Sequence, residues 1–402
     1  MKLSKALASA SALCAIFAAT QANALNIELR NTGGVEAGTQ ALAGFTAAKH
    51  FWETVITNDV NVKLNVGFGQ LGAGILGSTG STTNVAYVGQ VFPALQASGN
   101  SQLDAIAAAN LPTTRPSLFI GGKAMDALIS APKADGTGVA LPLSRVLDDN
   151  ASGNNSAFSA NTSLMKALGL APTYTGGNAA IMADGSVTFS NQFNWDFDPT
   201  NGITNNQIDF IGVAIHEIGH ALGFRSGVDI YDANAGFGGN LGDFAIQSIW
   251  DIFRYSQDSI ALGVNDWAIG GTGSSSPFFS IDGQNIYNGD AFLSTGRING
   301  DGRQASHWKD NTPGQPQLGI LDPTVAFGQQ SVVTSLDLAA YDAMGWNLRY
   351  DVMKYGDKTF STRDIFDLDA RVPEPSTWAL LIGGFFMAGG MVRSRRRAFV
   401  RV

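Results

Sequence analysis

Residues 215–224 read Ile-His-Glu-Ile-Gly-His-Ala-Leu-Gly-Phe and contain the pattern HExxH. In a helix with 3.6 residues per turn, His216 and His220 project from one face, one turn apart. Two imidazoles so placed can bind one tetrahedral Zn²⁺, and Glu217 lies where it can deprotonate a water on that metal. The spacing therefore predicts a metal-binding helix with a general base beside it.

The flanks of this motif are apolar, which indicates a buried helix. Residues 210–215 and 221–222 surround the two histidines with Phe, Ile, Val, Ala and Leu, so the helix is apolar nearly all round. Two histidines and a glutamate are costly in such a setting without a partner. The alternative interpretation, a core helix with two satisfied histidines, is therefore less favoured than a metal site.

A catalytic zinc needs a third protein ligand and one open position. The chain has four histidines, and His307 is the only one downstream of the motif. A glutamate is nearly excluded because none lies between residues 218 and 373. Asp229 and Asp232 remain as alternatives to His307. We expect His50, upstream of the motif, to be a surface or packing residue.

Three blocks of sequence carry a resemblance to a known family. After HExxHxxGF come a long insertion, a Ser-His-Trp block at 306–308, a turn ending in Asp-Pro at 319–323, and a segment at 337–346 ending in Met-Gly-Trp. This order resembles the leishmanolysin-type metzincins, and is still more similar to secreted bacterial metalloproteases that carry a PEP-CTERM tail. The resemblance is tight in the blocks and loose over the rest of residues 37–350.

The resemblance implies an α+β fold of the zincin type. An N-terminal lobe would hold a mixed twisted sheet and helices, including the HExxH helix. A loop-rich C-terminal lobe would follow, with the active-site cleft between them. It also implies that His307 is the third zinc ligand. The sequence departs from the family at Ser226, where metzincins have their third histidine, and at Leu321, where they have the methionine of the Met-turn; Met344 is the alternative for the latter.

Both ends of the chain resemble targeting segments. Residues 1–24 have a charged start, an apolar run and a small-x-small cleavage site, which predict a secretory signal peptide. Residues 372–397 combine Pro-Glu-Pro, a 16-residue apolar run and an arginine cluster, and resemble a PEP-CTERM sorting signal. The resemblance implies processing by an exosortase, transient membrane association through the tail, and export to the surface or matrix of a Gram-negative bacterium.

We expect the catalytic domain at residues 25–350, with lobes of about 25–224 and 225–350, and a linker at 351–371. Of 25 Lys and Arg and 33 Asp and Glu, the leader and residues 372–402 together hold seven and one, which leaves 18 basic against 32 acidic residues. A net charge of about −14 argues against nucleic acid and anionic membranes as partners. The sole cysteine, Cys14, lies in the leader, so thiol chemistry is excluded for the mature chain.

Hydrophobic periodicity predicts the remaining elements. We expect helices at 37–56, within 91–111, at 163–170 and at 241–250, strands at 60–66, 186–193 and 278–282, and mostly loop at 112–156. In metzincins the edge strand before the active-site helix pairs with extended substrate, and by position 186–193 is the candidate.

Two oxygen-rich segments, 196–202 and 299–302, are weak candidates for Ca²⁺ and are better interpreted as solvated turns. Tyr231 could donate to an oxyanion, but a core tyrosine is the simpler interpretation. Together these patterns predict a secreted zinc endopeptidase that acts on peptide or protein substrates. The alternatives are a non-catalytic surface or matrix protein on the same fold, and a zinc hydrolase of non-peptide amides.

Overall fold

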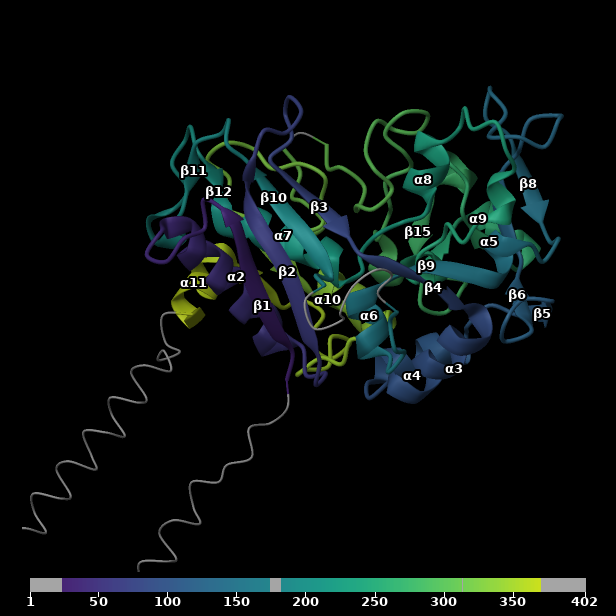
Figure 1. Ribbon diagram of the computed structural model, residues 1–402, viewed down its shortest axis with the longest axis horizontal. Helices are drawn as coiled ribbons and strands as arrows, with labels where there is room; N and C mark the ends of the chain where they lie inside the picture. Colours follow the sequence, from purple (N-terminus) through teal and green to yellow (C-terminus); the bar gives the residue numbers. More distant parts are fainter. Residues whose placement is uncertain (1–23, 174–181, 313, 370–402) are drawn as a thin grey trace, which may run out of the picture.

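A computed structural model describes residues 24–173, 182–312 and 314–369 of the chain (Figure 1). The fold is α+β, with several small sheets and a central helix that carries HExxH, as the sequence predicts at this level. The helices of four or more residues are α2 (Gln40–Val55), α3 (Val88–Ser98), α4 (Gln102–Ala109), α5 (Gly153–Ser156), α6 (Thr162–Ala167), α7 (Phe210–Leu222), α8 (Val228–Ala233), α9 (Gln257–Leu262), α10 (Ser335–Ala343) and α11 (Thr362–Asp369).

The strands are β1 (Asn26–Gly33), β2 (Asn61–Gly69), β3 (Gly77–Ser81), β4 (Thr83–Tyr87), β5 (Thr114–Pro116), β6 (Lys123–Met125), β7 (Ala127–Ser130), β8 (Arg145–Asp148), β9 (Ala157–Asn161), β10 (Gly185–Ser190), β11 (Trp195–Asp196), β12 (Ile208–Asp209), β13 (Arg254–Tyr255), β14 (Asn265–Asp266), β15 (Phe278–Phe279), β16 (Val332–Thr334) and β17 (Thr359–Ser361). The 3₁₀ turns are η2 (Pro199–Asn201), η3 (Leu241–Asp243), η4 (Trp250–Phe253), η5 (Gly273–Ser275) and η6 (Tyr287–Gly289).

A four-stranded sheet in the order β1-β2-β10-β3 forms the frame of the N-terminal part. β1, β2 and β10 are parallel, and β3 pairs antiparallel with β10. α2 and α7 lie against each other beside this sheet (Figure 1). Phe45 of α2 meets Phe189 of β10 at a ring distance of 4.9 Å, and Trp52 donates to the carbonyl of Ile215 at 3.2 Å. Phe210 at the start of α7 packs on Phe45 and Phe189 at ring distances of 5.2 and 4.6 Å, so aromatic contacts fix α7 against both α2 and the sheet.

The expected edge strand at 186–193 is wrong. β10 covers Gly185–Ser190 and lies inside the sheet between β2 and β3, so β3 is the edge. β3 reads Gly-Ser-Thr-Gly-Ser and has no apolar alternation. The prediction failed because β3 packs on α7 through small residues, Gly77 and Thr79, and so lacks the hydrophobic period from which the strands were predicted.

The expected helix at 241–250 is also wrong, because only the 3₁₀ turns η3 and η4 form there. The backbone groups of this stretch bond elsewhere: Gln247 accepts from the amide of Ser159 at 2.7 Å, and Ser248 donates to the Asp251 carboxylate at 2.7 Å. These long-range and local bonds replace helical ones. The strand expected at 278–282 is confirmed only as β15, Phe278–Phe279.

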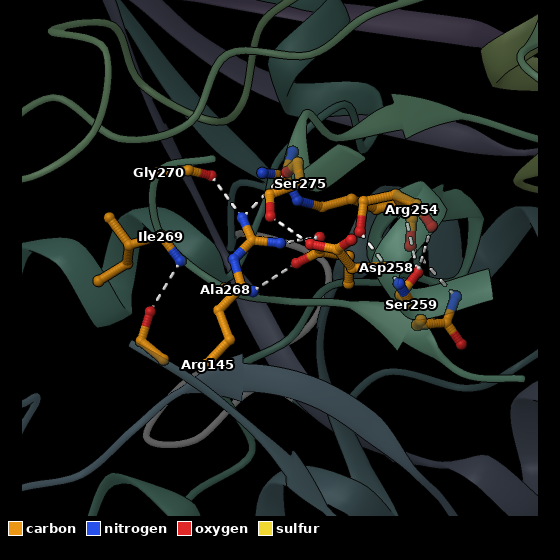
Figure 2. Close-up of polar contacts among 12 residues, drawn as sticks. Arg145, Arg254, Asp258, Ser259, Ala268, Ile269, Gly270 and Ser275 are labelled. Atoms are coloured by element: carbon orange, nitrogen blue, oxygen red, sulfur yellow. Dashed lines mark hydrogen bonds and ion pairs between the residues drawn. The ribbon is translucent and has the colours of Figure 1, made fainter. Parts of the chain in front are cut away.

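Residues 112–156, expected as loop, supply β5 to β8 and α5 to the C-terminal part of the molecule. Figure 2 shows Arg145 of β8 reaching the carbonyls of Gly270 and Ser275, at 2.8 and 3.0 Å, and it also pairs with the buried Asp266 at 2.6 Å. One arginine thus ties a segment before α7 to two segments after it. Arg254 lies close by and is fully buried (Figure 2).

The expected linker at 351–371 is folded as far as the structure describes it, through Asp369. β17 pairs antiparallel with β16, and α11 packs on α2 with Ile365 buried. Thr362 donates at 2.7 Å to the carboxylate of Asp209, the residue that caps α7. The domain therefore continues past residue 350. The expected signal peptide, apart from Ala24, and the sorting tail lie outside the described residues, and no helix among the described residues is long and apolar enough to cross a membrane.

Candidate metal centre

The two ends of α7 are set by a capping aspartate and a terminating glycine. The Asp209 carboxylate accepts from the Gly212 amide at 3.0 Å and so caps the N-terminus. Its other oxygen accepts from Ser331 and Thr362, which anchors the start of α7 to the C-terminal segments. Gly223 ends the helix with a φ of 129°, which a side chain would disfavour.

Three histidines converge at the C-terminal half of α7. The Nε2 atoms of His216 and His220 lie 3.0 Å apart, those of His220 and His307 3.2 Å, and those of His307 and His216 3.3 Å. Donors about 2.05 Å from a tetrahedral ion would be separated by about 3.3 Å, so the triangle has the size that a zinc ion requires. Among the described residues this is the only group of His, Cys, Asp or Glu placed to hold a metal.

The second ring nitrogen of each histidine is held by a backbone carbonyl. Nδ1 donates to Ile320 at 2.7 Å in His216, to Phe224 at 2.7 Å in His220 and to Gln304 at 3.2 Å in His307. A carbonyl only accepts, so each Nδ1 carries the proton and each Nε2 presents a lone pair to the other two. Three converging lone pairs repel one another unless a cation lies between them.

Burial keeps these imidazoles neutral. It lowers the pKa of His216 to about 4 and that of His220 to about 3, and it holds the pKa of His307 well below the ordinary value. Neutral imidazole is the form that binds a metal. The donor set therefore fits a divalent ion at neutral pH with no proton to displace.

Asp229 and Asp232, the alternative third ligands, brace loops and do not join the donor set. Asp229 accepts from the amides of Ala305 and Ser306, at 2.6 and 3.1 Å, and from the Ser306 hydroxyl at 2.5 Å, and so fixes the loop that ends in His307. Asp232, one turn along α8, accepts from the amides at 298 and 299. Ser226, at the family position of the third histidine, hydrogen-bonds Asp251 instead.

Asp337 ties together the sequence blocks that carried the resemblance. It is fully buried on α10 and accepts from the Trp308 indole at 2.8 Å and from the amides of Ile320 and Leu321 at 2.8 and 3.3 Å. Ile320 in turn holds His216. Leu321 is fully buried against α7, at the position expected for the Met-turn methionine.

Met344 is the alternative candidate for the Met-turn, and it lies at the end of α10 and not in that turn.

Glu217 points from α7 toward β3, away from the carbonyls that hold the histidines. The Thr79 hydroxyl of β3 lies 2.7 Å from Oε2 of Glu217 and 2.8 Å from its backbone carbonyl, and shares its one proton between these two acceptors. Burial raises the pKa of Glu217 to about 7, which suits a group that accepts and returns a proton near neutral pH. Gly77 leaves the space that Oε1 occupies, because a Cβ there would lie 2.5 Å from this oxygen.

The histidines and Glu217 line a cleft with a volume of about 660 Å³. One wall is β3 with the loop before it, residues 73–81. The opposite wall comes from segments after α7, at 225–230, 297–307 and 317–325. The cleft therefore runs between the edge strand and the C-terminal part of the chain, and the edge strand has free backbone groups along it.

The other candidate residues have structural roles. Asp196 accepts from Thr204, and Asp301 accepts from Thr295 and pairs with Lys309, so both weak candidate segments for Ca²⁺ are closed turns without a carboxylate cluster. Tyr231 is buried and accepts from Asn154, which makes it a core residue. His50 contacts Asp369 of α11, far along the chain from the metal ligands.

Sequence reasoning missed Gly77, Thr79 and Asp337 as parts of the site. A small polar strand without apolar period gave no signal for the first two, and Asp337 gave none beyond its place at the start of the 337–346 segment. No protein-family model, no curated protein and no solved structure matches the chain.

Proposed function

We propose that this protein is a zinc-dependent endopeptidase with a zincin-type arrangement. The observation that carries the proposal is the convergence of three neutral imidazole Nε2 atoms beside a buried glutamate, at the floor of an open cleft. Three protein ligands and an accessible fourth position are typical of catalytic zinc, whereas structural zinc is closed by four protein ligands. Histidine donors without cysteine suit zinc better than Ca²⁺ or Mg²⁺, which take oxygen ligands.

The chain's own residues supply the proton transfers. When bound, the metal supplies Lewis acidity and lowers the pKa of the attacking water. Glu217 accepts the proton of that water at its carboxylate and later donates it to the leaving amine. Thr79 holds Oε2 at 2.7 Å and so fixes the direction in which the carboxylate presents its second oxygen. Carbonyl partners on Nδ1 keep the three donors oriented.

The edge strand favours extended polypeptide as the substrate. β3 has β10 on one side only, so its outer backbone groups are available to a peptide that lies along the cleft. Strand addition uses backbone hydrogen bonds and tolerates many side chains. We infer further that the mature protein acts outside the cell after removal of residues 1–24 and exosortase processing of the tail at 372–397.

The test compares the full chain with Glu217→Gln. The measurements are zinc content by mass spectrometry of metals and cleavage of a proteome-derived peptide library. Both proteins should hold one zinc, and only the wild type should create new internal cleavage sites. Turnover by Glu217→Gln at the wild-type rate would contradict the proposed role of Glu217 as the general base. A folded, zinc-loaded wild type that cleaves nothing would favour the non-catalytic matrix role or a non-peptide amide substrate.

A further inference from the structure

The solvent-facing charges of the cleft are arginines, although the chain as a whole is acidic. Arg297 and Arg303 are exposed on the C-terminal wall and Arg225 is partly exposed below them. The acidic residues that line the same cleft are Glu217, Asp229 and Asp322. Glu217 and Asp322 are buried. The Asp229 carboxylate accepts hydrogen bonds from Ala305 and Ser306, in the loop that carries His307. The formal net charge of the chain is −8, so this wall is a local reversal of sign.

Arg297 and Arg303 lie on one short hairpin, which we call the arginine hairpin (residues 296–303). Gly296 and Arg303 form an antiparallel bridge, with the Gly296 amide donating to the Arg303 carbonyl at 3.0 Å. The tip is fixed by Asp232, which accepts from the amides of Ile298 and Asn299 at 2.7 and 2.8 Å. The two guanidinium groups therefore extend from a backbone that is held in place.

These arginines are under-neutralised by the described part of the chain. Arg297 forms no ion pair or hydrogen bond with any described residue, and Arg303 pairs through Nε with Asp310 at 2.8 Å. Arg225 donates to neutral groups, Asn161 at 3.4 Å and Ser159, but it lies near the carboxylates of Asp251 and Asp229, so the uncompensated charge is centred on the hairpin. The nearby Asp301 is paired with Lys309. Excess positive charge at the wall of a cleft raises the local concentration of anionic groups.

We propose that the arginine hairpin, with Arg225, binds side-chain carboxylates of the substrate, so that the protein acts on polypeptides with Asp or Glu close to the scissile bond. Arginine presents paired N–H groups that match a carboxylate. The rest of the surface is acidic and repels such a polypeptide, whereas the arginines of the cleft attract its carboxylates. This inference rests on the proposed function, because it treats the bound polypeptide as a substrate. The binding itself is measurable without turnover.

The experiment uses zinc-loaded full chain carrying Glu217→Gln and fluorescein-labelled Ala-Gly octapeptides with amidated C-termini. Three peptides differ only in a central pair of residues, which is Glu-Glu, Gln-Gln or Lys-Lys. Binding is followed by fluorescence anisotropy with and without Arg297→Glu. The matched control is Arg363→Glu, because Arg363 is exposed on α11 and does not line the cleft.

We expect the Glu-Glu peptide to bind about fivefold to tenfold more tightly than Gln-Gln at 50 mM salt. The preference should shrink as salt shortens the screening length. Arg297→Glu should remove or invert the preference, and Arg363→Glu should keep it. A fourth peptide, neutral but with a free C-terminal carboxylate, separates side-chain recognition from recognition of a chain end.

Equal binding of the Glu-Glu and Gln-Gln peptides would overturn the inference, as would a preference that survives Arg297→Glu. Preferential binding only of the free C-terminus would also overturn it. Cleavage by the wild type decides the proposed function separately. A wild type that cleaves neutral and acidic peptides equally well would leave the endopeptidase proposal standing and remove this one.

Discussion

Replacing Gly77 with alanine should slow catalysis about 10²-fold without removing the metal. The added Cβ would lie 2.5 Å from Oε1 of Glu217 and 2.9 Å from its Cγ and Cδ, where ordinary contact begins at 3.4 Å. The carboxylate must therefore move by roughly 1 Å, and a displacement of that size costs about 10²-fold in rate. The expected loss in kcat corresponds to about 2.7 kcal/mol of barrier. The three histidines are not contacted by this methyl group, so zinc content should stay at one.

The matched control is Gly80→Ala, on the same strand. A Cβ at Gly80 meets nothing within 4 Å, so this variant changes strand propensity alone. The assay is kcat for the best library peptide at saturating substrate, together with zinc content and Tm for each protein. Overpacking at Gly77 should lower stability by about 1–3 kcal/mol as well. If Gly77→Ala turns over like Gly80→Ala, Glu217 is not held where the structure places it, or it is not the general base.

Three further outcomes are expected. Asp229→Ala should weaken zinc binding by about 10–100-fold in a chelator competition, because it frees the loop before His307; unchanged affinity would contradict the brace. A chain ending at residue 350 should lose roughly 3–6 kcal/mol relative to one ending at 369, since it loses the burial of Val352 and Ile365 and uncovers the apolar surface on which they pack; equal urea midpoints would contradict this. Burial, with repulsion from Asp104, raises the pKa of Asp342 to about 8. The folded state then binds the proton more tightly than the unfolded state, so stability falls as pH rises from about 4 to 8, by at most about 1.4 kcal/mol per unit. Asp342→Asn should flatten that slope in Tm measurements from pH 5 to 9.

The residues that the sequence placed in the centre are the ones that the structure brings together. His216, Glu217 and His220 followed from helical spacing alone, because i and i+4 meet on one face in any helix. Scarcity of donors left His307, Asp229 and Asp232 as possible third ligands, and the resemblance to metzincins favoured His307 among them. Position in space entered neither argument, so the distance between the His220 and His307 nitrogens, 3.2 Å, is information that only the folded chain supplies.

The errors arose where long-range contacts override local pattern. The stretch at 241–250 has helical spacing, but its backbone bonds to β9 and to Asp251 instead. The segment at 351–369 is polar enough to resemble a linker, yet Ile365 and Thr362 are buried against elements more than a hundred residues earlier. β3 escaped notice because an edge strand can be entirely small and polar. In each case at least one of the partners that decide the structure is distant in sequence.

Because His307 is far along the chain from His216 and His220, the complete donor set forms only after the chain has folded. His307 follows His220 by 87 residues, and closing a flexible loop of that length costs about 4 kcal/mol of entropy plus a constant. Until α8 has docked and Asp229 has fixed the incoming loop, the chain offers only two of its three donors. A nascent or unfolded chain therefore has no complete site. The three-histidine centre forms only with the tertiary structure, so the proposed hydrolase would be inactive in the producing cell until the chain has folded.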